Sequence, residues 1–185
     1  ISNAFENSSF SIFHGRWNRY IEEVLTSPLS YRTMVSAYVL AAAIRGAIVG
    51  VLIALIGAFF TSVGVARPLY LVAFAVVITL LFAGFGVAGG LWADDFDDLT
   101  MLNQFILRPL VFFGGVFYSL NELPATVQQV SLLNPMIYMV NGVRFGFLGV
   151  SEVDPNASLA VLGTLTLGVI VADIALFRRG YGLTD

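Results

Sequence analysis

The 185-residue sequence contains no cysteine, no lysine and a single histidine, His14. Without cysteine these residues form no disulfide and offer no thiol nucleophile, and one histidine among scattered acids gives no metal-ligand spacing. All nine basic residues are arginine, so there is no glycine-rich phosphate loop ending in Gly-Lys-Ser or Gly-Lys-Thr. These absences argue against thiol or metal chemistry and against an ATPase of the phosphate-loop type.

Charge is also scarce in this chain. Only 11% of the residues are charged and 58% are hydrophobic, against about 25% and 45–50% in ordinary soluble domains. The mean hydropathy is +0.87. The net charge of −3 is small, and the arginines do not cluster as a nucleic-acid-binding surface requires. The composition therefore predicts an all-α, polytopic protein of a cell membrane with no nucleic-acid partner.

Four segments are long and apolar enough to cross a bilayer, whose hydrocarbon core takes about 20 residues of helix. The second carries no charge and follows Pro68, a residue favoured in the first turn of a helix. The third contains Pro109, which lacks a backbone donor and is expected to kink or break that helix. The predicted spans are residues 37–60, 69–93, 99–120 and 157–177.

The distribution of arginine predicts the orientation of these spans. Four crossings put both ends on one side, and short cytoplasmic segments collect basic residues. We therefore expect both ends of this chain to be cytoplasmic, together with the acidic turn at 94–98. The arginines then inside are Arg16, Arg19, Arg32, Arg178 and Arg179, and those outside are Arg67 and Arg144.

Residues 121–156 are too polar and too rich in proline and glycine to form another span. Two short apolar pieces, LPATVQQVSLL and MIYMVNGVRFGFLG, are separated by an Asn-Pro step that breaks a helix. We expect two short re-entrant helices that form a lid at the outer face, and a solvated loop is the alternative. The residues assigned to this lid are Pro124, Asn134, Pro135, Tyr138 and Arg144.

The segment at 16–27 has the spacing of an amphipathic helix. Its apolar residues recur at intervals of three and four, with acids and Arg19 on the other face. Pro28 should end this helix, and Ser30 can cap the helix that becomes the first span. On periodicity alone, the segment is an interfacial helix that holds the first span at the headgroups. The apolar residues are Trp17, Tyr20, Ile21, Val24 and Leu25.

Small residues recur at every fourth position in the first span and again in the last one. Such stripes let another helix approach closely, either within one protomer or at a subunit interface. Both interpretations stay open from the sequence. The stripes are Ala42, Gly46, Gly50, Ala54 and Ala58, and Thr164, Gly168 and Ala172.

Three charged residues, Arg45, Arg108 and Asp173, fall within the predicted spans. A charge at mid-membrane costs about 2.5–3.5 kcal/mol on insertion scales, so each needs a means of stabilisation. Either they extend to the inner headgroups, or Asp173 pairs with one of the two arginines inside the helix bundle.

Two longer motifs carry a resemblance to a known family. They are EEVLTSPLSYRTMV, directly before the first span, and FFGGVFYSLNELPATVQQVSLLNPMIYMVNGVR, before the last. With these motifs the chain resembles, over nearly its whole length, the permease subunit of type-2 ABC exporters, which export drugs, polysaccharides or lipids from bacteria. The resemblance implies a six-span protomer of which four spans are present, with the N-terminal part missing and residues 1–15 ending a preceding span.

The resemblance also implies partners and a function. It makes residues 16–27 a coupling helix that docks on a separate cytoplasmic ABC ATPase, which binds ATP and Mg while this chain binds no cofactor. It further implies a second permease protomer, identical or a sister subunit, surrounding lipid, and a pathway for an amphipathic, lipid-linked or drug-like substrate. The residues assigned to coupling are Arg19, Glu22, Glu23, Leu25 and Pro28.

Two other functions stay open from the sequence. An intramembrane enzyme would need Arg108, Asp173 and His14 to lie close together. No nucleophile and base in the sequence have the spacing of a known catalytic motif. The other alternative is a passive channel or membrane scaffold that has no ATPase partner.

Overall fold

The computed structural model describes residues 1–61 and 64–183. All regular secondary structure in these ranges is helical, which confirms the all-α prediction. Four helical runs in them are long and apolar enough to cross a membrane, as predicted. They are α3 (Tyr31–Phe60), α4 (Pro68–Trp92), the run Phe96–Val116 and α9 (Pro155–Arg179).

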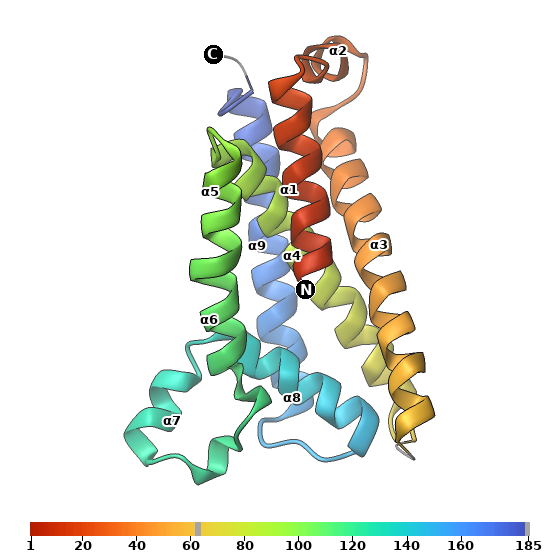
Figure 1. Ribbon diagram of the computed structural model, residues 1–185, viewed down its shortest axis with the longest axis vertical. Coiled ribbons are helices and arrows are strands. Elements are labelled where there is room, and N and C mark those ends of the chain that lie inside the picture. Colours follow the sequence, from red (N-terminus) through yellow and green to blue (C-terminus); the bar gives the residue numbers. More distant parts are fainter. Residues whose placement is uncertain (62–63, 184–185) are drawn as a thin grey trace.

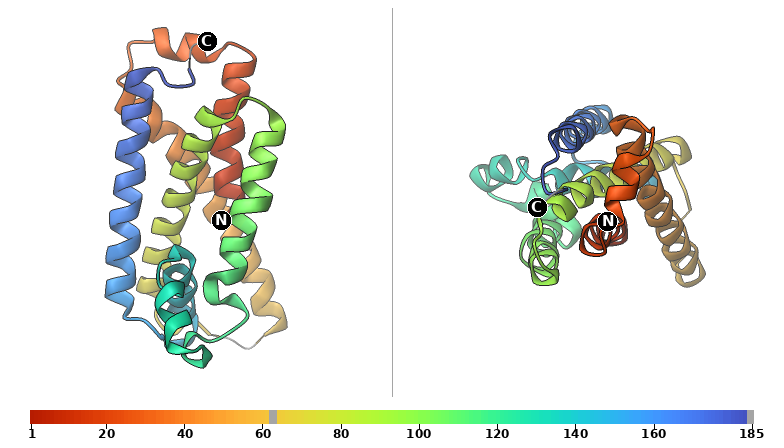
Figure 2. Two further views of the ribbon diagram at one scale, coloured as in Figure 1. Left: turned by 90° about the vertical axis from the view of Figure 1, so that its left-hand side faces the viewer. Right: turned by 90° about the horizontal axis from the view of Figure 1, so that it is seen from above.

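Helix α4 is the centre of the bundle, and α1 (Ser2–Trp17), α3 and α9 all pack against it. Figures 1 and 2 show α1 between α3 and the run that contains α5 and α6, with α9 behind. Helix α2 (Ile21–Thr26) and the C-terminal end of α9 lie at one end of the bundle. At the other end, α8 (Pro135–Leu148) lies across the bundle and α7 (Ala125–Ser131) projects beside it.

Local sequence signals explain where the long helices begin and end. The Ser30 side chain accepts a hydrogen bond from the amide of Thr33 at 3.2 Å, so Ser30 caps α3 as predicted. Asp154 caps α9 in the same way, through the amide of Ala157 at 2.8 Å. Helix α9 ends at Gly180, whose φ of 68° lies in the left-handed region that favours glycine.

The third span differs from its prediction. It consists of α5 (Phe96–Met101), a π-helical segment at 102–107, α6 (Arg108–Val111) and a second π-helical segment at 112–116. Pro109 does not break it, because the wider π turn before it accommodates a residue that cannot complete the usual hydrogen-bond ladder. The helix stops instead at Gly115, whose φ is 80°, and so it ends before the predicted residue 120.

Glycines on α4 let its neighbours approach at backbone distance. A Cβ atom at Gly86 would overlap the Ser8 side chain and the carbonyl oxygen of Phe5 in α1. A Cβ atom at Gly90 would lie 2.5 Å from the carbonyl oxygen of Ser9. Helix α1 is thus held against α4 by contacts that no larger residue permits.

The small-residue stripe on α3 is only partly used within the protomer. A Cβ atom at Gly46 would lie 2.8 Å from the Cβ of Ala4, so α1 packs on this part of the stripe. Farther along α3, Gly50 has nothing within 4 Å of its Cβ position, and both Ala54 and Ala58 are exposed. The second stripe, on α9, is exposed at Thr164, Gly168 and Ala172.

We expect Gly86→Ala and Gly90→Ala each to lower the thermal stability of the purified permease. The added methyl group overlaps the α1 backbone, and overpacking a tight contact costs about 1–3 kcal/mol or more. Gly50→Ala is the matched control: its Cβ meets open space, and alanine in a helix interior should raise stability by up to about 1 kcal/mol. Equal melting temperatures for the three variants would contradict the close α1–α4 contact.

Candidate functional site

Helix α1 has a polar face that points away from the bundle. The face consists of residues spaced at three and four along the helix, all of them exposed or half-buried. The opposite side of α1, with Ala4, Phe5 and Ile12, is buried against α3 and α4. The residues of this α1 polar face are Asn3, Glu6, Asn7, Phe10, Ser11 and His14.

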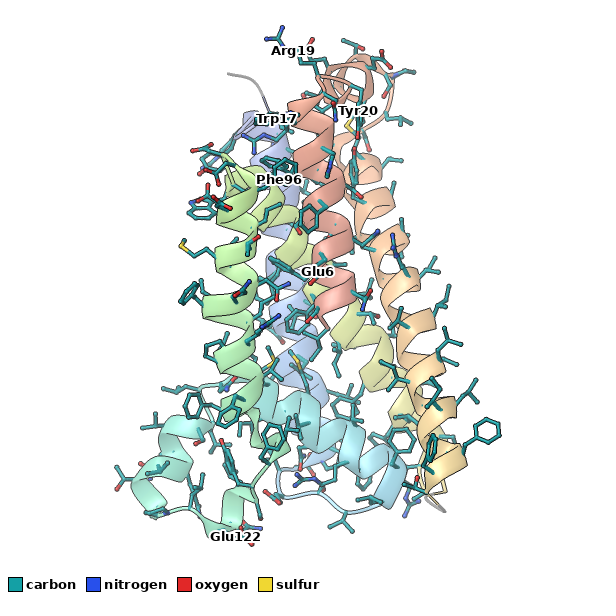
Figure 3. The ribbon with its side chains drawn as sticks, viewed as in Figure 1. Glu6, Trp17, Arg19, Tyr20, Phe96 and Glu122 are labelled. Atoms are coloured by element: carbon teal, nitrogen blue, oxygen red, sulfur yellow. The ribbon has the colours of Figure 1, made fainter. Side chains whose placement is uncertain are left out.

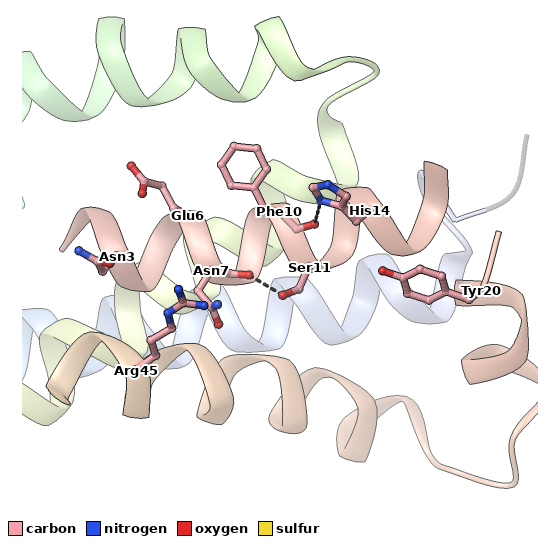
Figure 4. A pocket seen from close by; sticks show the side chains of 8 residues that line it. All are labelled: Asn3, Glu6, Asn7, Phe10, Ser11, His14, Tyr20 and Arg45. Carbon is pink, nitrogen blue, oxygen red and sulfur yellow. Dashed lines mark hydrogen bonds between the residues drawn. The ribbon is translucent and has the colours of Figure 1, made fainter. Parts of the chain in front are cut away.

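The α1 polar face forms an open groove of about 490 Å³ together with Arg45 of α3 and Tyr20. Figure 4 shows the Arg45 side chain extending from α3 toward Asn7. Within the groove, the Ser11 hydroxyl donates to the carbonyl oxygen of Asn7 at 2.6 Å. At the edge of this face, toward the third span, the Asn103 side chain donates to the Glu6 carboxylate at 2.5 Å. The groove therefore exposes polar groups from two helices.

Two arginines flank α1 at the depth of the spans. Arg45 lies roughly 21 Å along α3 from Tyr31, and it forms no ion pair within the part of the chain that the structure describes. Arg108 is also exposed, and it lines a separate depression of about 180 Å³ with Ser2 and Phe112. The exposed side of α1 thus has a cationic side chain on each flank.

Sequence reasoning missed the α1 polar face, because residues 1–15 were interpreted only as the end of a span. The spacing of Asn3, Asn7, Ser11 and His14, every fourth or third residue, is the signal that identifies it. This pattern distinguishes a span that faces a polar surface from one surrounded by lipid.

Asp173 neither pairs with an arginine nor reaches the headgroups, so both sequence-based alternatives are wrong. Its side chain is fully buried, with 0% exposure. Neither carboxylate oxygen has a hydrogen-bond partner among the residues that the structure describes. The reason is its direction: one oxygen lies 3.3 Å from the Cβ position of Gly84, so the side chain faces α4 rather than the helix end.

The three residues required for an intramembrane enzyme do not meet. Arg108 lies beside Ser2, whereas His14 is roughly 18 Å farther along α1, and Asp173 has no polar partner in the described ranges. In those ranges, no group of three His, Asp or Glu side chains is placed to hold a metal ion.

The predicted amphipathic helix at 16–27 is wrong in extent. Helix α1 continues through Trp17, the chain turns at Arg19 with a φ of 61°, and α2 begins only at Ile21. Arg16 explains the change, because its guanidinium donates to three carbonyl oxygens at the end of α4. These belong to Gly90, Leu91 and Ala93, at 2.9, 3.1 and 2.7 Å.

The residues assigned to coupling divide into two sets. Leu25 is half-buried against the core, beside the buried Ile21 that was not assigned to coupling, so Leu25 packs α2 on its own protomer. Arg19, Glu22, Glu23 and Pro28 are exposed. Figure 3 shows Arg19 at the end of the bundle opposite Glu122. The exposed set is thus free to contact another chain.

The acidic turn at 94–98 is not entirely solvated. The centroid of its Phe96 ring lies 4.7 Å from that of Phe13, in an edge-to-face arrangement, and 6.1 Å from that of Trp17. Asp94 lies 4.0 Å from Arg16. The start of the third span is therefore attached to the same end of α1 that leads into α2.

At the opposite end of the bundle, an ion pair joins two segments of the predicted lid region. Arg144 of α8 and Glu152 are 2.8 Å apart, and Arg144 also donates to the carbonyl oxygen of Gly115 at 3.0 Å. Glu152 accepts from the Ser119 hydroxyl at 2.8 Å and the Leu120 amide at 2.6 Å. We call Arg144, Glu152 and these contacts the outer clamp, because they lie in the segment that the sequence predicts to form a lid at the outer face.

Further polar bonds hold α8 in place. Asn141 accepts from the amide of Glu152 and donates to the carbonyl oxygen of Val153, both at 2.7 Å. Asn134 caps α8 and donates to the carbonyl oxygen of Leu110 at 3.0 Å. The sequence predicts Asn134 and Arg144 as lid residues but does not single out Asn141 or Glu152, because their partners lie on other segments of the fold.

The structure contains the two short helices expected for the lid, and the break between them lies at Asn134 and Pro135. Pro124 precedes α7, and the Tyr138 hydroxyl donates to the carbonyl oxygen of Leu132 at 2.9 Å. The solvated-loop alternative is therefore wrong for this segment.

Comparisons with known proteins agree with this architecture. The family model described as ABC-2 type transporter matches residues 1–148. The chain is 36% identical over 183 residues to the inner membrane transport permease YadH of Escherichia coli K12, covering 99% of this chain and 72% of that protein. It is 23% identical over 162 residues to nodulation protein J of Rhizobium leguminosarum, covering 85% and 61%. No solved structure matches the chain.

The family model covers most of the chain, and the Escherichia coli relative matches it nearly from end to end. The four apolar spans have the form that a membrane permease requires. The chain therefore belongs to the ABC-2 type transporter family and is a multi-pass membrane permease.

Proposed function

We propose that this permease forms, with a second permease protomer, the pathway of an exporter for an amphipathic, lipid-linked or drug-like substrate. A separate cytoplasmic ATPase, which binds ATP and Mg, drives the transport. The relative named as an inner membrane transport permease supports an inner-membrane location. The observation that carries the proposal is the α1 polar face, with Arg45 and Arg108 on its flanks.

Lipid cannot cover this face at low cost. Exposed polar groups in a hydrocarbon environment are expensive, and ionisable side chains within spans usually face a bundle interior or a water-filled cavity. In the single protomer, no further helix lies over the open side of α1 between α3 and the third span (Figure 2), which is the side that the groove with Arg45 occupies. A second protomer that encloses water on this side meets the requirement.

The distribution of charge supports cytoplasmic placement of the end that carries α2. That end holds Arg19, with Arg178 and Arg179 at the end of α9, whereas Arg67 and Arg144 lie toward the other. In this orientation α2 faces the ATPase, and α7 and α8 form the outer lid.

Helix α2 is the proposed coupling element. Its exposed acids Glu22 and Glu23 present negative charge beyond the end of the bundle, and its apolar side rests on the core. Because Arg16 ties the preceding turn to the end of α4, a push on α2 acts on a rigid part of the protomer. The outer clamp then keeps the outer mouth closed in this conformation.

Cysteine labelling tests the proposed pathway without knowledge of the substrate. A cysteine at Ser11 should react rapidly with a membrane-impermeant thiol reagent in permeabilised cells, because water reaches the α1 polar face. Thr164→Cys is the matched control: Thr164 is exposed on α9, and its hydroxyl bonds to its own helix as that of Ser11 does. Mass spectrometry gives both rates. A pathway at the α1 polar face is ruled out if Ser11→Cys reacts no faster than Thr164→Cys.

The second prediction concerns coupling. Reversing Glu22 and Glu23 to arginine should abolish co-purification of the ATPase, or its stimulation by the permease, because complementary charge becomes repulsive. Membrane insertion should be unchanged, since both side chains are exposed. Glu122→Arg, an exposed acid at the other end, is the control. ATPase binding and stimulation that survive the reversal would remove α2 from the docking surface, and a permease that never associates with an ATPase would favour a channel or scaffold.

The third prediction concerns the outer clamp. A cysteine at Ile137, buried at 4% exposure beneath the clamp, should label slowly from outside. Glu152→Gln or Arg144→Gln should each speed labelling by about tenfold or more, because a partly buried charged hydrogen bond contributes about 1.5–3 kcal/mol. Changing both residues should raise the labelling rate by less than the product of the two single-variant factors, because neither charge is then left unpaired. Strict additivity would show that the two side chains act separately.

A further inference from the structure

The carboxyl group of Asp173 has an unusual environment for a charged residue. It lies in α9 with 0% exposure, and neither oxygen has a hydrogen-bond partner in the described residues. Val169, one turn earlier, packs so closely on α4 that a Cβ atom at Gly84 would lie 2.8 Å from its Cγ1. The carboxyl is thus enclosed in the contact between α4 and α9.

The helices that pack on α9 bring no charge to this carboxyl. Helix α4 contains no acidic or basic residue, and the hydroxyl of its Tyr70 bonds to Asn156 at the start of α9. From α3, the Tyr38 ring packs near this part of α9, with its centroid 6.3 Å from that of Phe177. Arg45 of α3 instead lines the groove at α1.

The remaining charged groups of these elements are engaged or lie at the helix ends. Arg144 of α8 is bound to Glu152, and the hydroxyl of Tyr138 in α8 donates to Leu132. Arg178 and Arg179 are exposed at the end of α9, and Arg32 is exposed at the start of α3. No hydrogen bond joins any of them to Asp173.

An ionised carboxylate is incompatible with this surrounding. An unpaired buried charge costs several kcal/mol, so a buried acid without a partner is far more stable as the neutral carboxylic acid. At 0% exposure, nothing outside the chain contacts this carboxyl without a rearrangement of the helices.

We propose that Asp173 is a proton-binding site, protonated in this conformation, and that release of its proton loosens the α4–α9 contact. The proposal does not depend on the ATPase or on the substrate. It makes the packing of α9 on α4 sensitive to pH, through one buried group within a span.

The direction of the effect follows from proton linkage. In the unfolded chain an aspartate side chain is ionised at neutral pH. The folded chain therefore holds one proton more than the unfolded chain, and stability falls as the pH rises through the neutral range.

Thermal unfolding of the purified full-length permease, between about pH 5 and about pH 9, tests this linkage. The melting temperature should fall by up to about 3–5 °C per pH unit in the wild type. Asp173→Asn, neutral at every pH, should remove this slope and keep the melting temperature of the wild type at low pH. Asp97→Asn, an exposed acid in the turn before the third span, should retain the slope. A wild-type slope that persists in Asp173→Asn would overturn the proposal.

Infrared difference spectra give a readout that does not depend on how the asparagine variant folds. The wild type and Asp97→Asn should both show the carbonyl band of a protonated carboxyl at neutral pH, and the band should disappear on alkalinisation. Amide hydrogen exchange of α9 peptides around Asp173 should rise as the band disappears, beyond the intrinsic pH dependence of exchange. The absence of the band at neutral pH, or its loss without faster exchange, would overturn the proposal.

Discussion

The fold depends on how closely α1 approaches α4. At Gly86 and Gly90 the two backbones are in direct contact, and a single methyl group would separate them. This contact involves Phe5, Ser8 and Ser9 of α1 and fixes the rotation of the helix about its axis. The rotation in turn directs the α1 polar face outward, toward the groove that it shares with Arg45. The position of the proposed pathway is thus a consequence of two glycines on a neighbouring helix.

Helix α4 also connects the two ends of the proposed coupling route. Arg16 binds the last carbonyl groups of α4, where the helix dipole places partial negative charge, and so fixes the turn that leads into α2. Toward the opposite end, α8 packs against α4, and its Arg144 holds the end of the third span at Gly115. In the proposed route, a displacement of α2 passes through the turn that Arg16 fixes to α4, and from α4 through α8 to the outer clamp.

Much of the architecture is predictable from the sequence, because it depends on local properties. Length and hydropathy identify four spans, and the Asn134-Pro135 step divides the lid helices. Two predictions failed because they depend on tertiary neighbours. Arg16 leaves the amphipathic pattern because the end of α4 attracts it, and Asp173 faces Gly84 instead of an arginine. Pro109 stays in a helix because a π turn precedes it, which no local rule for proline specifies.

Charged side chains in and beside the spans are stabilised in three different ways, and each has a different mechanical consequence. Arg45 is exposed in the groove, so its environment changes with whatever occupies the pathway. Arg144 and Glu152 neutralise each other, so their segments can separate only by breaking several bonds at once. Asp173 has neither water nor a partner, so the proposed bound proton is its remaining means of neutralisation. Because ionisation of that carboxyl would leave an unpaired buried charge, the proposed loss of its proton destabilises the α4–α9 contact directly.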